Sequence, residues 1–294
     1  MTVSRRTVLR VLGAGAAGVA AAGAVPARAR ERARLAPDAR GLLYDSTLCI
    51  GCRACVTRCK QANDLPPDAT PMMGATYDAP ADLNATTKTV IQLYQEGGTS
   101  AFVKRQCMQC VDPACVTACM IHAFQKGPQG VITYDKSRCI GCRYCQIACP
   151  FNVPKFEWAK VFPKIVKCEL CRHREEGPAC SEVCPRGAVI HGQTSSLLAE
   201  AKRRIAAAPA KYNPKVYGET DAGGTQCLYL AAAGIAFEKL GLPDLGPEPV
   251  PEKAVRLQHG LYQGMIAPAV LYAALGAVVW RNRKKGEQGK EGGR

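Results

Sequence analysis

Aromatic residues and histidines are scarce in this sequence, and their scarcity narrows its possible functions. Aromatic side chains make up 6% of the 294 residues, and four residues are histidine. A formal net charge of +15 would ordinarily suggest nucleic-acid binding, but no basic stretch interleaved with aromatics occurs in the central part of the chain. The chain also lacks a pair of carboxylates, or a nucleophile beside a base, that would indicate catalysis. We therefore expect a protein that is not an enzyme and does not bind nucleic acid.

The positive charge is concentrated at the two ends of the chain. Residues 1–40 carry a local charge of +6, and residues 281–294 carry a local charge of +4. The central part is therefore much less basic than the whole chain.

The first 29 residues have the layout of a signal peptide. Arg5 and Arg6 precede an apolar, Ala- and Gly-rich stretch over residues 11–26, and Ala27-Arg28-Ala29 offers a small-x-small cleavage site. The apolar stretch is too short for a membrane span. The paired arginines predict the twin-arginine route, which exports folded proteins; a chance pair before an ordinary signal is the alternative. We expect residues 1–29 to direct export to the periplasmic side of the bacterial inner membrane.

A second apolar segment lies near the C-terminus. Leu261–Trp280 contains 20 residues without a charge, enough for a helix of roughly 30 Å, the thickness of a bilayer core. The basic tail over residues 281–294 follows it, and the positive-inside rule keeps such a tail cytoplasmic. We therefore expect a transmembrane helix over residues 260–280 that anchors the chain on the periplasmic side. A buried core helix is the alternative.

Cysteine is the most unusual component of the sequence. Of 17 cysteines, sixteen fall in four tight groups. The first and third groups have the spacing C-x2-C-x2-C-x3-C of bacterial ferredoxins, the second has C-x2-C-x4-C-x3-C, and the fourth has C-x2-C-x8-C-x3-C. In order, the groups are Cys49, Cys52, Cys55 and Cys59; Cys107, Cys110, Cys115 and Cys119; Cys139, Cys142, Cys145 and Cys149; and Cys168, Cys171, Cys180 and Cys184. Three cysteines in a loop can wrap one cubane while the fourth reaches a neighbouring cubane, so the groups predict four [4Fe–4S] clusters with iron as the metal.

Zinc and disulfides are the alternative uses for such cysteines. Zinc ribbons contain C-x2-C pairs, but a zinc site closes with four ligands and does not use runs of four closely spaced cysteines. Cysteines in C-x-x-C runs are poor disulfide partners for each other. Cys227 lies outside the groups, and we expect it to be a small core residue in a buried strand. The histidines are scattered, and we expect His259 to be an interfacial anchor where the chain enters the membrane.

An internal repeat relates the first and third groups. Residues 42–59 align without gaps on residues 132–149, with nine identities in 18 positions. The apolar residues before each group predict a short strand that enters the cysteine loop. The predicted fold class is α+β, a duplicated bacterial ferredoxin-type domain over residues 41–200, with an insertion within the Pro- and Asp-rich region 60–100. A helix is expected over residues 196–208. Residues 201–259, which become rich in Pro and Gly after this helix, are expected to form an extended strap or linker.

These features resemble the four-cluster iron–sulfur electron-transfer subunits of respiratory complexes. Within that family, the chain is most similar to the membrane-anchored ferredoxin-like subunits of the hydrogenase-2 type. The segments that carry the resemblance are residues 41–49, 106–113, 167–171, 218–226 and 258–264, together with the export signal and the C-terminal helix. The beta subunits of respiratory formate dehydrogenases resemble it in the four clusters and the final helix, but they usually cross the membrane on a partner's signal.

The resemblance implies how the cysteine groups combine. In the family, the first and fourth groups fold together as one ferredoxin unit, and the second and third groups fold as another. The implied ligand sets are Cys49, Cys52, Cys55 and Cys184; Cys59, Cys168, Cys171 and Cys180; Cys107, Cys110, Cys115 and Cys149; and Cys119, Cys139, Cys142 and Cys145. Every ligand position is cysteine, so no three-iron cluster is implied.

The resemblance also implies a function. It predicts that the chain carries electrons between a periplasmic [NiFe] hydrogenase, made of small and large subunits, and a quinone-reactive integral membrane subunit. The alternative is the iron–sulfur beta subunit of a formate dehydrogenase or of another molybdopterin oxidoreductase.

Overall fold

The computed structural model describes most of the central part of the chain. The described residues are 33–67, 80–158, 160, 163–252, 268 and 270–281. The chain divides into two compact units, one formed by Arg32–Pro251 and the other by Met1–Glu31 together with Glu252–Arg294. All the cysteines belong to the first unit.

In the unit formed by the two ends, residues 270–281 are helical. No helix among the described residues is both long and apolar enough to cross a bilayer. The expected signal peptide, residues 1–29, lies outside the described residues. The same holds for residues 253–267 and 269, which include His259 and much of the expected span, and for residues 282–294 of the expected tail.

The cysteine-bearing unit consists of short strands and short helices. The strands are β1 (Arg40–Asp45), β2 (Val90–Glu96), β3 (Thr99–Arg105), β4 (Phe124–Lys126), β5 (Ile132–Tyr134), β6 (Lys155–Phe156), β7 (Ile165–Val166), β8 (Val189–Gln193) and β9 (Cys227–Leu230). The α-helices are α2 (Ala54–Ala62), α3 (Ala114–Thr117), α4 (Tyr144–Ala148), α5 (Ala179–Glu182) and α6 (Thr194–Ala207), and the 3-10 turns are η1 (Pro128–Gly130), η2 (Asp221–Gly223) and η3 (Glu238–Leu240). This mixture of helix and strand agrees with the predicted α+β class.

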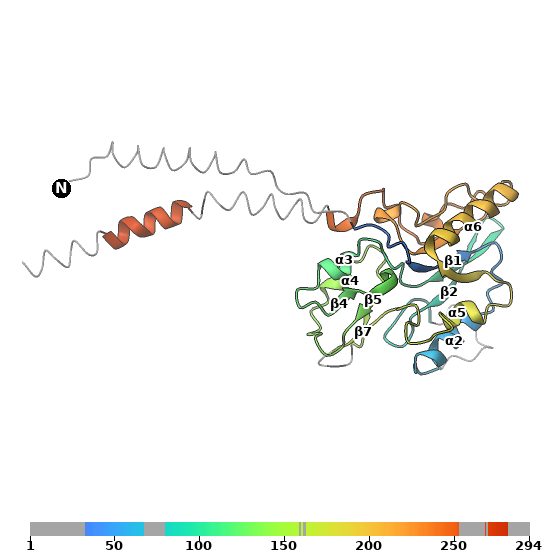
Figure 1. The fold of residues 1–294 in the computed structure, drawn as a ribbon, viewed down its shortest axis with the longest axis horizontal. Helices are drawn as coiled ribbons and strands as arrows, with labels where there is room; N and C mark the ends of the chain where they lie inside the picture. The colour runs from blue at the N-terminus through green and yellow to red at the C-terminus, as the bar shows by residue number, and fades with distance from the viewer. Residues whose placement is uncertain are drawn as a thin grey trace, which may run out of the picture. The chain divides into compact units, whose positions relative to one another are not determined.

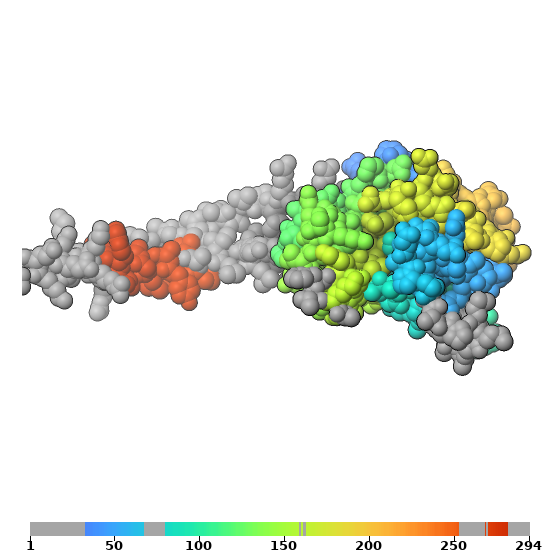
Figure 2. Space-filling model, turned by 90° about the horizontal axis from the view of Figure 1, so that it is seen from below, coloured from blue at the N-terminus to red at the C-terminus, as the bar shows by residue number. Residues whose placement is uncertain are grey.

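Four of the helices carry cysteines, and they pack in two pairs. Helix α2, with Cys55 and Cys59, packs on α5, with Cys180, and α3, with Cys115, packs on α4, with Cys145. Figure 1 shows the two pairs well apart within the unit. In Figure 2 the blue surface around α2 adjoins the yellow surface around α5, and the green surface of the other pair lies to one side. The unit therefore has two halves, one built from the first and fourth groups and one from the second and third.

Strand β1 is the centre of a three-stranded sheet with the order β8-β1-β9. It pairs antiparallel with β8, where Leu42 faces His191, and parallel with β9, where Leu42 faces Cys227. Every residue of β1 after Arg40 is buried, as expected for a strand that is paired on both edges and covered on both faces. The remaining strands form two-stranded sheets, β2 with β3, β4 with β5 and β6 with β7.

Alternate residues of β1 contact different cores because successive side chains of a strand point to opposite faces. Leu42 and Tyr44 pack in the larger core, which also contains many of the cysteines. Leu43 packs with Leu197 and Ala201 of α6 in a separate core. Helix α6 thus covers the face of the sheet that points away from the cysteines, and Figure 1 shows it beside β1.

The segment after α6 differs from the extended strap expected over residues 201–259. Its described part up to Pro251 belongs to the compact unit, and β9 lies beside β1 inside the sheet. All four residues of β9 are buried, and Leu240 and Leu242 pack in the larger core. Proline and glycine shape the loops of this segment, but its apolar side chains bury enough surface to hold it against the cysteine loops.

Asp45, at the end of β1, is a fully buried carboxylate that connects the sheet to α6 and to Tyr212, which follows α6. It accepts hydrogen bonds from the backbone nitrogen and Oγ1 of Thr47 (3.0 and 2.6 Å), from Nη1 of Arg204 (3.0 Å) and from the hydroxyl of Tyr212 (2.9 Å). Its counterpart in the repeat, Asp135, is exposed and bonds to residues two and three positions further on.

We expect Asp45→Asn to lower the free energy of unfolding by about 2 kcal/mol, because a buried charge-assisted hydrogen-bond network loses its charge. The midpoint of thermal unfolding, followed by circular dichroism, should fall by roughly 4–8 °C. Asp135→Asn is the matched control, since it makes the same change at an exposed site, and it should change stability by less than about 0.5 kcal/mol. Equal shifts in the two variants would contradict the role assigned to Asp45.

Candidate metal centres

Each of the four cysteine groups forms a loop with the same backbone turn. The residue before the second cysteine has a positive φ in every group: 73° at Gly51, 51° at Gln109, 73° at Gly141 and 52° at Leu170. Glycine adopts this conformation freely, whereas a residue with a side chain loses roughly 1–2 kcal/mol. Such strain persists where the surroundings enforce it, and it is frequent at functional sites.

Gln109 illustrates how the surroundings hold the turn. Its side chain donates a hydrogen bond to the backbone oxygen of Cys168 (2.9 Å) and accepts one from the backbone nitrogen of Ile132 (2.8 Å). Gln109 is fully buried, so both bonds are shielded from water. The bond to Cys168 holds the second cysteine group against the fourth, and the bond from Ile132 holds it against β5.

Two pockets of the unit are each lined by four cysteines. The cysteines of the first set are Cys49, Cys52, Cys55 and Cys184, and those of the fourth set are Cys119, Cys139, Cys142 and Cys145. In each pocket, three cysteines of one loop meet one cysteine of another group. The pockets contain about 350 and 300 Å³, counting the solvent at their mouths, that no protein atom fills.

A second set consists of Cys59, Cys168, Cys171 and Cys180. The side-chain amide of Asn63 donates to the sulfurs of both Cys59 and Cys171, each at 3.7 Å. Burial raises the pKa of the Cys59 thiol, and the nearby sulfurs of Cys168, Cys180 and Cys171 raise it further. The structure therefore brings these four residues together although they come from the first and fourth groups.

The third set combines the second group with the last cysteine of the third group. Burial raises the pKa of the Cys110 thiol, and the nearby sulfurs of Cys107, Cys149, Cys115 and Cys227 add to the shift. The structure thus brings members of each implied set near one another, and the assignment of the sixteen cysteines as ligands of four clusters stays a prediction.

The four sets follow one another in a row. The electrostatic contacts between successive sets are Cys55 with Cys180, Cys168 with Cys107, and Cys115 with Cys145. The two end sets reach the surface, since Cys52 and Cys142 are exposed. The row thus has an exposed cysteine in each of its two end sets.

Burial makes an isolated negative charge on these sulfurs unfavourable, so the sets favour the binding of a cation. Burial raises the pKa of Cys55 to about 11, of Cys168 to about 11 and of Cys145 to about 12. Without a cation, such thiols stay protonated at neutral pH; a bound metal replaces the proton, because the thiolate is the ligand. All-sulfur donor sets suit iron–sulfur clusters as well as zinc.

The number and spacing of the cysteines favour iron–sulfur clusters, because a zinc site closes with four ligands and does not use runs of four closely spaced cysteines. Within the described ranges, no group of three or more His, Cys, Asp or Glu side chains is arranged to hold a single metal ion. In the first and fourth sets, four cysteines line one pocket each. The donor sets therefore fit a polynuclear iron–sulfur group.

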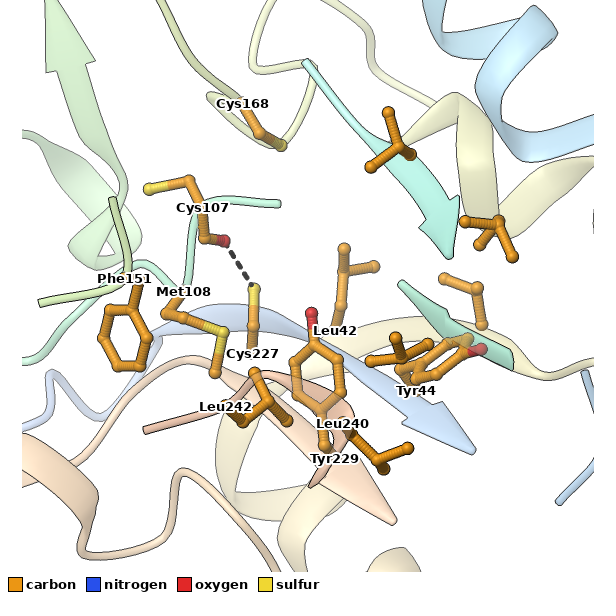
Figure 3. Close-up of a cluster of buried hydrophobic side chains, with 14 of the residues drawn as sticks. Leu42, Tyr44, Cys107, Met108, Phe151, Cys168, Cys227, Tyr229, Leu240 and Leu242 are labelled. Carbon is orange, nitrogen blue, oxygen red and sulfur yellow. Dashed lines mark hydrogen bonds between the residues drawn. The ribbon is translucent and has the colours of Figure 1, made fainter. Parts of the chain in front are cut away.

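Cys227 lies near the second and third sets but belongs to neither. It is fully buried, its sulfur donates a hydrogen bond to the backbone oxygen of Cys107 (3.3 Å), and it accepts one from the side chain of Gln106 (3.7 Å). Figure 3 shows Cys227 beneath Cys107, among Met108 and the leucines of the larger core. The structure confirms the expectation of a buried residue in a strand.

Sequence reasoning missed the polar side chains that approach the sulfurs. Lys104 and Lys167 are 0% and 3% exposed, and Asn63 and Gln109 bond directly to cysteine residues. Lys104 follows the buried Val103 on β3, so strand alternation would have placed it in solvent. The one sequence signal for Lys167 is its position directly before Cys168.

We expect Cys227 to resist maleimide in the native protein at pH 8. Burial raises the pKa of its thiol well above the ordinary value, so the reactive thiolate is scarce, and the reagent has no access to it. Mass spectrometry of protein labelled before and after denaturation measures this, with Cys227→Ala as the control. The same variant should keep its full iron content; a loss of about four irons would instead make Cys227 a cluster ligand.

Comparisons with known proteins agree with this geometry. Residues 99–194 match the model of the 4Fe-4S dicluster domain family. The hydrogenase-2 operon protein HybA of Escherichia coli O157:H7 is 38% identical over 96% of this chain and 96% of its own length. A protein of Nitratidesulfovibrio vulgaris is 40% identical over 85% of this chain and 70% of its own length.

A third relative matches a smaller part of the chain. The iron–sulfur subunit of the nitrate-inducible formate dehydrogenase of Escherichia coli K12 is 35% identical over 64% of this chain and 66% of its own length. The match to HybA extends over nearly all of both chains, and the donor sets fit iron–sulfur clusters. The chain therefore belongs to the family of iron–sulfur electron-transfer subunits that includes the hydrogenase-2 operon protein HybA.

Proposed function

We propose that this chain carries electrons through four [4Fe–4S] clusters between a periplasmic [NiFe] hydrogenase and a quinone-reactive integral membrane subunit. The observation that carries the proposal is the row of four sulfur sets with exposed cysteines at its two ends. Each set would hold one cluster, so all sixteen grouped cysteines are ligands and Cys227 is not. A cluster bound by four thiolates accepts and releases one electron, with a potential set by its surroundings.

Hydrogen bonds to sulfur are one means by which this chain adjusts the potentials. The backbone nitrogen of Ala123 donates to the sulfur of Cys119 (3.2 Å), and that of Leu170 donates to the sulfur of Cys168 (3.4 Å). Asn63 donates to two sulfurs of the second set. A donor near sulfur stabilises the extra negative charge that reduction brings, so these bonds favour the reduced state.

The ends of the row are suited to contacts with partner proteins. Ile50, beside the first set, has 56% of its surface exposed, and exposed apolar residues gather around the fourth set. The latter are Met120, Ile140, Tyr144, Ile147 and Trp158, which are 52–79% exposed. Apolar side chains left in water near an electron-transfer site favour docking of another subunit there.

A hydrogenase is preferred over a formate dehydrogenase as the partner. The similarity to HybA covers 96% of this chain, whereas the similarity to the formate dehydrogenase subunit covers 64%. The wider match thus covers nearly the whole chain. We therefore assign a non-catalytic relay in a hydrogenase complex, with catalysis in the partner subunits.

We also propose that the chain is exported by the twin-arginine route and anchored by its C-terminal helix. Arg5, Arg6 and the apolar residues 11–26 support the export signal. The described helical residues 270–281 support the anchor, because the large apolar side chains there are 42–74% exposed and thus free to contact lipid.

The ligand assignment predicts which cysteine substitutions act on the same cluster. The purified protein should contain about 16 irons, and Cys119→Ser or Cys145→Ser should each leave about 12. The double variant should also contain about 12, because both residues belong to the fourth set. Cys49→Ser combined with Cys119→Ser is the control, and it should contain about 8.

Iron and sulfide analysis measures these contents, and electron paramagnetic resonance of the reduced protein counts the clusters. Equal iron contents in the two double variants would contradict the assignment. A colourless protein that binds zinc would overturn the proposed function altogether.

The proposed anchor predicts the effect of a truncation. Deleting residues 257–294 should release the protein from the membrane fraction and abolish electron transfer to quinone, while hydrogen oxidation with an artificial acceptor continues. Fractionation and activity assays with both acceptors measure this. If the truncated complex stayed membrane-bound and quinone-active, the anchoring role would be wrong.

A further inference from the structure

Two buried lysines lie among the sulfur sets. Lys104, on β3, is 0% exposed, and its ammonium donates to the hydroxyl of the buried Thr89. Lys167 is 3% exposed, and its ammonium donates to the backbone oxygens of Ile132 (2.5 Å) and Cys168 (3.1 Å). In the described part of the chain, neither lysine forms an ion pair with a carboxylate. A buried charge is costly unless an opposite charge lies near it, so both lysines need another source of negative charge.

As thiolate ligands of the proposed clusters, the sulfurs are that source for Lys104. Its ammonium interacts electrostatically with Cys180, Cys59 and Cys168 of the second set and with Cys55 of the first. Lys104 therefore lies where the first two sets meet, and it contacts more ligands of the second.

Lys167 has the same relation to the third set. It acts on the sulfurs of Cys107, Cys115 and Cys149, all of which belong to that set. Its bond to the backbone of Cys168 fixes the ammonium close to the boundary with the second set.

Among the described residues, no lysine is a principal electrostatic neighbour of Cys145 in the fourth set. Those neighbours are the sulfurs of its own set. Arg143 lines the pocket of the fourth set, but its guanidinium lies over the exposed ring of Trp158 at 4.0 Å. Arg53 holds the equivalent place beside the first set, so the two arginines do not distinguish one end of the row from the other.

We propose that Lys104 and Lys167 are fixed countercharges that raise the reduction potentials of the clusters in the first three sets above that of the fourth. Reduction adds one negative charge to a cluster, and a positive charge held in a medium of low dielectric constant stabilises the reduced form. The inference rests on the proposed function, in which each set holds one cluster. The fourth set is then the low-potential end of the row, and electrons collect in the sets beside the lysines.

The test is a redox titration of the purified complex, followed by electron paramagnetic resonance, with Lys104→Met and Lys167→Met. At the wild-type midpoint, Lys104→Met should reduce the ratio of reduced to oxidised cluster at least tenfold for the first and second sets, a shift of about 59 mV or more for one electron. Lys167→Met should reduce the same ratio at least tenfold for the cluster of the third set. Neither should change the cluster of lowest potential, which belongs to the fourth set. Cys142→Ser identifies its signal, because that residue belongs to the fourth set.

Two matched variants separate charge from packing. Lys104→Arg keeps the charge and should titrate within threefold of the wild type. Lys202→Met removes a lysine from the exposed face of α6, where it pairs with Glu219, and should change no potential. Lys104→Gln removes the charge but keeps a donor for Thr89, and it replaces Lys104→Met if that variant fails to assemble.

Iron content distinguishes failure of this inference from failure of the proposed function. A wild-type protein without four clusters would overturn the function. If the charge-removing variants hold all their iron yet titrate as the wild type does, the role of the lysines is wrong. The same conclusion follows if they shift the lowest-potential cluster as much as the others.

Discussion

The cost of burying negative sulfur governs this structure. Sixteen cysteines crowd into four adjoining sets, and burial raises the pKa of those most enclosed, such as Cys55 and Cys168. Metal, hydrogen-bond donors and cations are the ways to offset that cost, and the protein provides for all three. The loops turn through positive φ, amide groups such as that of Asn63 donate to sulfur, and lysines replace the apolar residues usual in a core. The positive-φ turns and the buried lysines each cost free energy alone, and the surrounding structure holds both in place beside the sulfurs.

The internal repeat, residues 42–59 and 132–149, places the same local structure in two different environments. The two copies share a strand, a cysteine loop and a left-handed arginine before a short helix, at Arg53 and Arg143. The copies diverge in what surrounds them. In the first copy, β1 is the central strand of a three-stranded sheet and Asp45 is buried. In the second copy, β5 belongs to a two-stranded sheet and Asp135, which follows it, is exposed. Duplication therefore preserved the metal-binding loop, while the surrounding fold distinguished the halves.

Much of the site could be predicted because cysteine spacing is a local property. The strands before the first and third groups, the helix expected over residues 196–208 and found as α6, and the buried strand at Cys227 all follow from short-range patterns. The place of β9 beside β1 could not be predicted, since parallel pairing of distant strands leaves no periodic trace in the sequence. Lys104 was missed for a related reason. A lysine on a strand usually points to solvent, and only the sulfurs gathered from the first and fourth groups explain its burial.

The position of β9 bears on how the protein is made. The first set is completed by Cys184, and the sheet that supports its loop is completed by Leu230, far along the chain. A ribosome must therefore have released most of the polypeptide before the earliest cysteines can find their partners. Contacts so distant in sequence close slowly. For the first set, iron and sulfide must then enter a nearly finished protein, and until they do its thiols depend on a reducing environment to remain unpaired.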